Sequence, residues 1–255
     1  MDLPKNKFKH ALARGELQVG LWCSLCSSIA AELVAYSGFD WLVLDTEHSP
    51  NEVPDLLAQL QAIMPGTASA VVRPAWNDTV LIKRVLDIGA QTVLLPYVQN
   101  AEEARRAVAA TRYPPRGGVR GVTASGRAAR YGRVGDYLQR AEEEICVLVQ
   151  AETRAALDNI ESIASVDGVD GVFIGPSDLA ASLGYIGHPG HPVVQAALKE
   201  AVDRLGKVGK PAGILTGNED EAKRYIEWGY LFVAVGADVG LLAKSADALA
   251  KKFKA

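Results

Sequence analysis

Long apolar runs are missing from this chain of 255 residues. No stretch approaches the roughly 20 consecutive apolar residues that a helix needs to cross a bilayer, and the polar residues 1–16 contain no apolar stretch typical of a secretion signal. The three cysteines are too few for a disulfide framework in a chain of this length. We therefore expect a soluble cytoplasmic protein that does not enter membranes.

A basic surplus is also missing. The chain has 27 Lys and Arg residues against 30 Asp and Glu, which gives a formal net charge of -3, and no Lys- or Arg-rich stripe is interleaved with aromatics. Nucleic acid is therefore not an expected partner. Neither G-x-G-x-x-G after the first apolar run nor G-x-x-x-x-G-K-[ST] occurs, which disfavours an open nucleotide-binding sheet.

What the chain does contain is a regular alternation of short β-rich runs with helical patterns. The runs are continuous rather than alternating in polarity, which is typical of parallel strands covered on both faces. Eight such units in about 250 residues predict a single (β/α)₈ TIM-barrel domain over residues 1–255, with a last helix in residues 239–255 and helix-ending glycines at Gly89, Gly209 and Gly229. The predicted strands are residues 18–24, 41–45, 69–73, 92–96, 145–152, 171–175, 211–215 and 231–236.

One segment does not fit this alternation. Residues 113–135, "YPPRGGVRGVTASGRAARYGRVG", are rich in Gly, Arg and Pro and have no apolar period. Because the β/α alternation resumes after them, they are interpreted as a long functional loop that serves as a lid or a subunit contact.

Polar side chains gather where the predicted strands end, which is where barrels of this type build their active sites. Each has an ordinary alternative: an acid near a helix start, a surface ion pair, a loop histidine. Several at the same end of neighbouring strands favour function, because charged groups leave water only for a reason. They are Asp45, Glu47, His48, Arg73, Gln150, Glu152, Ser177 and Asp178.

Two of these residues indicate a metal site. Glu152 and Asp178 follow adjacent predicted strands, and carboxylates with space left for water and an anionic substrate are typical ligands of Mg²⁺ or Mn²⁺. Residues two apart on a strand share a face, so Gln150 and Glu152 should both point into the barrel mouth. The backbone N–H groups of Ser177 and Asp178 would form a cradle for a carboxylate.

These motifs together resemble the class II pyruvate aldolases of the HpcH/HpaI family. The resemblance extends over nearly the whole chain and is most specific in "VFIGPSDL" and "VQAET", with support from "VLDTEHSPN" and "VVRPAWND". It implies a divalent metal, Mg²⁺, Mn²⁺ or Co²⁺, and reversible cleavage of 4-hydroxy-2-oxo acids such as 4-hydroxy-2-oxoheptane-1,7-dioate to pyruvate and an aldehyde (succinic semialdehyde). An alternative within the family is a 2-keto-3-deoxy sugar acid as substrate.

The resemblance also implies roles for individual residues. Glu152 and Asp178 would hold the metal, Arg73 would stabilise the pyruvate enolate, and His48 would perform acid–base chemistry, either paired with Asp87 or oriented by Asp45. It further implies a homo-oligomer, a hexamer built as a trimer of dimers, in which the last helix packs on a neighbouring barrel. Substrate contacts would come from Gln150, Gly175, Ser177 and Asp178, and the aldehyde pocket from Trp22, Leu215 and Ala237.

The sequence also contains features of three other functions. An imine-forming aldolase needs a lysine at a strand's C-terminal end, whereas Lys210 precedes a strand and Lys83 lies in a helical pattern. A thiol redox protein is suggested by Cys23 and Cys26, but all three cysteines, Cys146 included, are better interpreted as small buried apolar residues. A barrel that only binds a ligand is the third alternative, against which the intact acids count.

Overall fold

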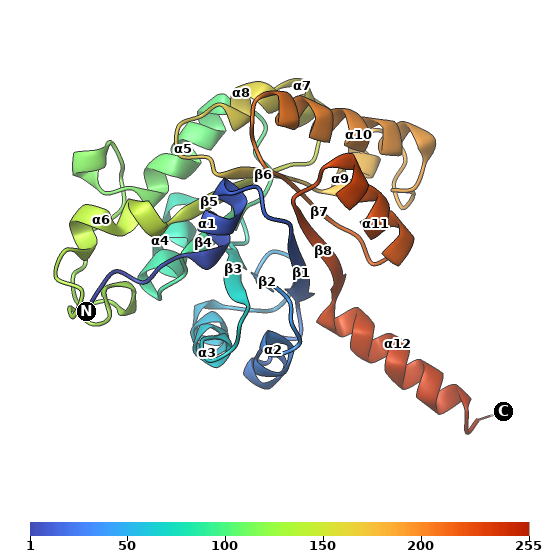
Figure 1. Cartoon of the computed structure of the whole chain (residues 1–255), viewed down its shortest axis with the longest axis horizontal. Coiled ribbons are helices and arrows are strands. Elements are labelled where there is room, and N and C mark those ends of the chain that lie inside the picture. The colour runs from blue at the N-terminus through green and yellow to red at the C-terminus, as the bar shows by residue number, and fades with distance from the viewer. Residues whose placement is uncertain (255) are drawn as a thin grey trace.

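The computed structural model describes residues 1–254 as a closed barrel of eight parallel strands in sequence order (Figure 1). All eight predicted strands are present, with ends shifted by at most a residue or two. The strands are β1 (Gln18–Cys23), β2 (Trp41–Asp45), β3 (Ser69–Arg73), β4 (Thr92–Leu95), β5 (Cys146–Ala151), β6 (Gly171–Ile174), β7 (Ala212–Leu215) and β8 (Phe232–Ala237).

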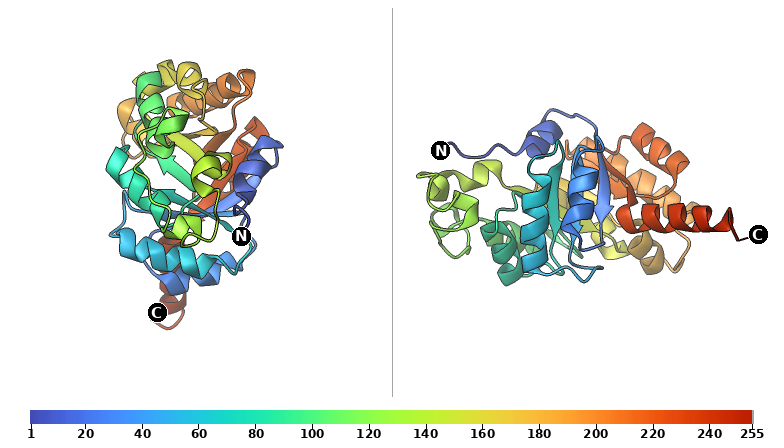
Figure 2. Two further views of the ribbon diagram at one scale, coloured as in Figure 1. Left: turned by 90° about the vertical axis from the view of Figure 1, so that its left-hand side faces the viewer. Right: turned by 90° about the horizontal axis from the view of Figure 1, so that it is seen from below.

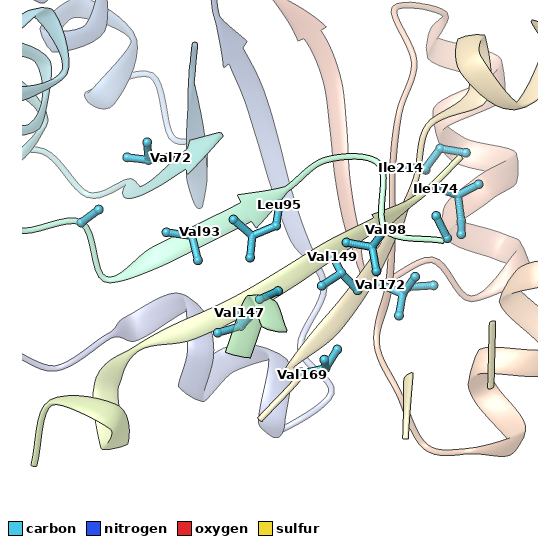
Figure 3. Close-up of a cluster of buried hydrophobic side chains, with 14 of the residues drawn as sticks. Val72, Val93, Leu95, Val98, Val147, Val149, Val169, Val172, Ile174 and Ile214 are labelled. Carbon is cyan, nitrogen blue, oxygen red and sulfur yellow. The ribbon is translucent and has the colours of Figure 1, made fainter. Parts of the chain in front are cut away.

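The strands bury both faces, which explains their continuous apolar sequence. On β5, Val147 and Val149 point outward into the layer between strands and helices (Figure 3), whereas Cys146 and Leu148 fill the barrel interior. This alternation, continued past Leu148, turns Gln150 inward at the strand's C-terminal end.

Helices follow the strands and cover the outside of the barrel (Figure 1). Gly89, Gly209 and Gly229 adopt positive φ values of 98°, 66° and 104° just beyond helix ends, as predicted. The helices are α1 (Lys7–Ala13), α2 (Ser28–Ala35), α3 (Val53–Ile63), α4 (Thr79–Asp87), α5 (Ala101–Thr111), α6 (Tyr137–Glu144), α7 (Arg154–Asp158), α8 (Ile160–Ala164), α9 (Pro176–Ser182), α10 (Pro192–Lys207), α11 (Glu219–Trp228) and α12 (Asp238–Lys251), with 3₁₀ turns η1 (Pro114–Arg116) and η2 (Arg127–Ala129).

The N-terminal end of the barrel is closed by α1. The Phe8 ring packs against Trp41, with centroids 5.6 Å apart, and edge-on against Phe232 at 6.0 Å. Phe8 and Leu12 are buried in the same apolar cluster as the inward side chains of the strands. Among the described residues, the barrel interior is therefore a packed core that is closed at the N-terminal ends of the strands.

The long loop, residues 113–135, lies at this same closed end. It connects the end of α5 to α6, and its Arg127 donates to the carbonyl of Ile88 at the end of α4. A lid over the mouth of its own barrel is thus a wrong interpretation, because the loop and the mouth lie at opposite ends of the strands. The subunit-contact interpretation stays a prediction.

The last helix, α12, extends away from the barrel. It leaves the body at the end of β8, far from the N-terminus along the long axis (Figures 1 and 2). Only Asp238 of this helix is buried, while Leu241, Leu242 and Leu249 are more than half exposed. No helix in residues 1–254 has both the length and the apolarity of a membrane span.

Candidate active site at the barrel mouth

An arginine fixed by two carboxylates lies at the C-terminal ends of β2 and β3. Asp45 and Arg73 are register partners on these strands, and the guanidinium donates through Nε and Nη2 to the two Asp45 carboxylate oxygens at 2.8 and 2.7 Å. Its Nη1 lies 2.7 Å from Oε2 of Glu47 in an ion pair that lacks hydrogen-bond alignment. Arg73 therefore points a fixed positive charge into the mouth, and only two of its five N–H groups are used by the hydrogen bonds to Asp45.

Trp22, on β1, supports this pair from below. Its indole N–H donates to Asp45 Oδ2 at 3.3 Å, and the Arg73 guanidinium lies over its ring, 5.1 Å from the centroid. Burial by itself would raise the pKa of Asp45, but the hydrogen bonds and charge of Arg73 hold that pKa below its ordinary value. Asp45 is therefore a permanent anion that orients Arg73.

Glu152 is the most perturbed acid of the site. Its two carboxylate oxygens accept hydrogen bonds from the Tyr97 backbone N–H at 2.9 Å and the Gln150 side chain at 2.7 Å. Burial, opposed by the Gln150 bond and reinforced by the charges of Glu47 and Asp178, raises the pKa of Glu152 to about 7. Gln150 and Glu152 thus face the same way, as predicted.

Gly175 makes room for this carboxylate. A Cβ atom on Gly175 would lie 2.4 Å from Oε2 of Glu152 and 3.0 Å from its Cβ. Gly175 precedes Pro176, Ser177 and Asp178 at the start of α9, and the last two side chains are exposed at the mouth. Because Gly175 of the "GPSD" motif has no side chain, the Glu152 carboxylate can lie close to the backbone segment that carries Asp178.

The mouth carries an excess of negative charge. Near the guanidinium of Arg73 lie four carboxylates, those of Asp45, Glu47, Glu152 and Asp178. The pKa of Glu47 is raised, because burial and the charges of Asp45 and Asp178 outweigh the lowering effect of Arg73. The buried Oε1 of Gln150 accepts no hydrogen bond. Repelling carboxylates beside an unpartnered oxygen suit a hard divalent cation.

Arg73 pairs with Asp45 and Glu47, and among residues 1–254 no arginine forms an ion pair with Glu152 or Asp178; their role as metal ligands stays a prediction. Within residues 1–254 no three His, Cys, Asp or Glu side chains are grouped to hold a metal ion by themselves. A cation at the mouth would therefore complete its coordination with substrate and water, as Mg²⁺ commonly does.

His48 lies at the rim with a different neighbour from those predicted. Its ring Nε2 is 3.9 Å from Glu47 Oε1, and its side chain is 64% exposed. From His48, the Asp45 carboxylate accepts the backbone N–H, at 3.5 Å, and not the ring, because it is already bound to Arg73 and Trp22. Asp45 thus orients the loop that carries His48 and does not hold the ring.

Asp87 does not pair with His48 within the chain. It is the last residue of α4, which returns to the closed end of the barrel, and its carboxylate accepts from Arg120 of the long loop at 2.9 Å. The buried Arg120 guanidinium also lies over the ring of Tyr113, 4.8 Å from its centroid. The predicted Asp87–His48 pair is therefore wrong for a single chain.

The remaining predicted residues lie around the same mouth. Trp22 and Ala237 are register partners at the ends of β1 and β8, and Leu215 ends β7. Leu215 and Ala237 are half-buried and pack against the apolar cluster that contains Trp22. Their part in an aldehyde pocket stays a prediction.

The residues on which other functions depended lie elsewhere. Lys210 donates to the carbonyl of Val169 at the closed end of the barrel, so it cannot form an imine at the mouth of its own barrel. Cys23 and Cys146 are buried as predicted, and burial raises the pKa of the Cys23 thiol to about 12. Cys26 differs from the prediction: it is partly exposed, in a turn with φ of 54°.

Two contributors received no role from the sequence. Glu47 was recognised at a strand end, yet only the structure shows that it binds Arg73 and neighbours His48. Tyr97 gives Glu152 a backbone N–H from a left-handed conformation with φ of 58°, and no residue type signals such a contact. The spacing "D-T-E-H" was the one available signal for Glu47.

Known proteins are similar to this chain in both sequence and fold. The model of the HpcH/HpaI aldolase/citrate lyase family matches residues 18–245. The chain is 60% identical to a pyruvate aldolase of Rhizobium etli, over 99% of both chains. It is 59% identical to a 4-hydroxy-2-oxo-heptane-1,7-dioate aldolase of Klebsiella pneumoniae, over 97% of this chain and 94% of that protein.

Solved structures agree with the sequence matches. A HpcH/HpaI aldolase/citrate lyase family protein from Burkholderia cenocepacia superposes with a TM-score of 0.95 at 39% identity, covering 98% of this chain and all of that one. A HpcH/HpaI aldolase from Desulfitobacterium hafniense gives 0.89 at 28% identity, with 97% and 96% covered. The chain belongs to the HpcH/HpaI aldolase/citrate lyase family.

Proposed function

We propose that this protein is a class II aldolase that reversibly cleaves 4-hydroxy-2-oxo acids to pyruvate and an aldehyde, with its catalytic machinery within one barrel domain of residues 1–255. The observation that carries the proposal is the mouth itself. There, Arg73 is held rigid by Asp45 and Glu47 beside the unneutralised acids Glu152 and Asp178. An anion that develops between these groups meets positive charge already in place.

For the substrate, the names of the relatives favour 4-hydroxy-2-oxoheptane-1,7-dioate, which would yield pyruvate and succinic semialdehyde. A 2-keto-3-deoxy sugar acid is the second candidate, because the pyruvate half of both substrates is the same. Trp22, Leu215 and Ala237 are the side chains proposed to discriminate between their aldehyde halves.

The donor set fits a divalent cation such as Mg²⁺, Mn²⁺ or Co²⁺, which Glu152 and Asp178 would hold. When bound, it would act as a Lewis acid toward the oxygens of the 2-oxo acid. Gln150 fixes the Glu152 carboxylate, and its unpartnered Oε1 is available to a water at the site. Gly175 and the backbone N–H groups of Ser177 and Asp178 would receive the substrate carboxylate at the start of α9.

Proton transfer is assigned to His48 at the rim. His48 removes the C4 hydroxyl proton directly or through one water, because an imidazole is the side chain best suited to act as a base at neutral pH. The C3–C4 bond then breaks, the aldehyde leaves, and the electron pair remains on C2–C3 as the pyruvate enolate. Arg73 donates its free N–H groups to the enolate oxygen, and a proton delivered to C3 completes pyruvate.

The assembly proposed is a homo-oligomer, a hexamer in which α12 packs on a neighbouring barrel. The support is the exposed apolar side chains on a helix that extends away from its own barrel (Figure 1). A cytoplasmic location is proposed with it, supported by three cysteines that form no disulfide in residues 1–254.

The test is hydrogen exchange at the pyruvate methyl group in D₂O, followed by NMR. Chelated protein should be inactive, and a low concentration of Mn²⁺ or Mg²⁺ should restore exchange. This measures the enolate half-reaction without the aldehyde. Exchange that ignores chelation, with trapping of pyruvate by borohydride, would reveal an imine enzyme and refute the proposal. No exchange with metal, pyruvate and succinic semialdehyde all present would leave a binding scaffold.

A further inference from the structure

A second cavity lies at the closed end of the barrel, away from the mouth. It has a volume of about 250 Å³ and is lined by the N-terminal segment 3–7, the end of α3, the residues that begin β3 and precede β4, and the η2 turn of the long loop. None of the residues assigned to aldol chemistry lines it. Its chemistry is therefore separate from that of the mouth.

The charges around this cavity do not balance. The lining includes Lys5, Lys7, Arg127 and Arg130 but only one acid, Glu144. That acid is already committed, because it accepts from the Lys5 ammonium at 2.8 Å, the Asn6 backbone N–H at 2.7 Å and His10 at 2.9 Å. Within residues 1–254, the two arginines are therefore left without an anionic partner among the residues that line the cavity.

The two guanidinium groups meet only neutral acceptors among residues 1–254. Arg127 donates to the Ile88 carbonyl at 2.7 Å, and Arg127 and Arg130 both approach the sulfur of Met64, at 3.8 and 3.5 Å. Among residues 1–254, no Asp or Glu forms an ion pair within 4.0 Å of either group. The two positive charges repel each other, and this repulsion together with burial lowers the pKa of Arg127.

The backbone is shaped to hold this unfavourable pair. Arg130, Tyr131 and Gly132 are three consecutive left-handed residues, with φ of 52°, 57° and 81°, a conformation that is costly for the two that carry side chains. Gly89 has φ of +98°, and a Cβ atom there would lie 2.6 Å from Nη1 of Arg127. The left-handed turn and the space left by Gly89 thus hold the half-buried Arg127 and Arg130 together. The two positive charges form a site that lacks an anion.

We propose that the cavity is a second ligand site, which binds the oxyanion group of a small metabolite, a carboxylate or a phosphate, between Arg127 and Arg130. Guanidinium groups bind such groups through paired charge-assisted hydrogen bonds. A cavity of this volume accepts a small organic acid and excludes a polymer. Because the site joins the N-terminal segment to the long loop, its occupation stabilises the closed end of the barrel.

The experiment measures thermal unfolding of the chelated full-length protein against succinate and inorganic phosphate, at ionic strength matched with chloride. Binding to the folded state should raise Tm in a saturable way, and the better of the two anions identifies the group. Arg130→Gln should weaken that affinity about tenfold, since it removes one charged partner and no backbone contact. Arg127→Gln/Arg130→Gln should abolish the shift.

Arg133→Gln is the matched control, because Arg133 lies in the same exposed loop and donates only to the Arg130 carbonyl; its Tm shift should equal that of the unaltered protein. Arg73→Ala should keep the shift as well. A shift lost in Arg73→Ala belongs to the mouth and overturns the proposal, as does the absence of any saturable shift or its survival in the double variant. A changed particle mass in Arg130→Gln would also overturn it, by making the arginine pair a contact between copies.

Discussion

At the residue scale, Arg73 is the side chain on which the proposed chemistry most depends. Arg73→Lys keeps a positive charge but loses the paired contact with Asp45, so we expect turnover to fall about 10²–10³-fold. Steady-state cleavage of 4-hydroxy-2-oxoheptane-1,7-dioate measures this. Mn²⁺ affinity, followed by calorimetry, should stay within a few-fold, because Glu152 and Asp178 are unchanged. Arg105→Lys is the control, because Arg105 forms an exposed ion pair with Glu102 on the same helix, and its turnover should not change. Near-native turnover of Arg73→Lys would contradict the role of Arg73.

Glu152 gives the metal-free protein a characteristic pH dependence. Its pKa is raised in the folded state to about 7 from 4.5, so between these values the folded protein binds more protons than the unfolded chain. The free energy of unfolding should therefore fall as pH rises through this window, by about 3 kcal/mol from this group. Urea unfolding of chelated protein from pH 5 to 8 measures the slope.

Two comparisons isolate the contribution of Glu152 to that slope. Glu152→Gln, which cannot ionise, should flatten it, and Mn²⁺ should stabilise the unaltered protein more at pH 8 than at pH 6. If Glu152→Gln retains the full slope, other groups cause it and the assigned perturbation is wrong.

Residue types at strand ends could be predicted, but their partners could not. The inward alternation past Leu148 located Gln150 and Glu152 from sequence alone. The partner of His48 could not be inferred, because it depends on how Asp45 is saturated by Arg73 and Trp22. Asp87 was assigned to His48 although α4 carries it to the opposite end of the barrel. The predicted β/α order already implies this position, because a helix that follows a barrel strand ends at the N-terminal end of the barrel; the pairing with His48 came from the family resemblance.

At the element scale, buried strands were the most predictable features. Their β-branched runs and flanking glycines determine them locally, whereas surface helices depend on context. Residues 154–164 form two short helices, α7 and α8, that meet at Asn159. Helix α6 was not predicted, since only Tyr137, Ala141 and Glu144 are buried. The path of the long loop could not be predicted because it depends on contacts between residues far apart in the sequence, such as Arg120 with Asp87 and Arg127 with the Ile88 carbonyl.

At the scale of the whole molecule, α12 determines the assembly in our proposal. Leu241→Glu/Leu242→Glu places two charges on its exposed apolar surface, so the particle should fall from a hexamer to smaller species without loss of the barrel. Light scattering during size-exclusion chromatography measures the mass, and far-UV circular dichroism checks the fold. Ser245→Glu, at an exposed polar position of the same helix, should leave the mass unchanged. A hexamer that survives the double substitution would rule out α12 as the contact.

Helix α1 closes one end of the barrel, because Phe8 and Leu12 pack against the inward side chains of the strands there. Among the described residues, the barrel opens at the C-terminal ends of the strands. With one end closed, the substrate that binds deepest in the mouth must bind first and dissociate last. If pyruvate binds deepest, as the proposed site implies, it loads before the aldehyde in the direction of synthesis, and an aldehyde at the rim blocks its entry. In that case, the order of substrate binding depends on the closure of the opposite end of the barrel by Phe8.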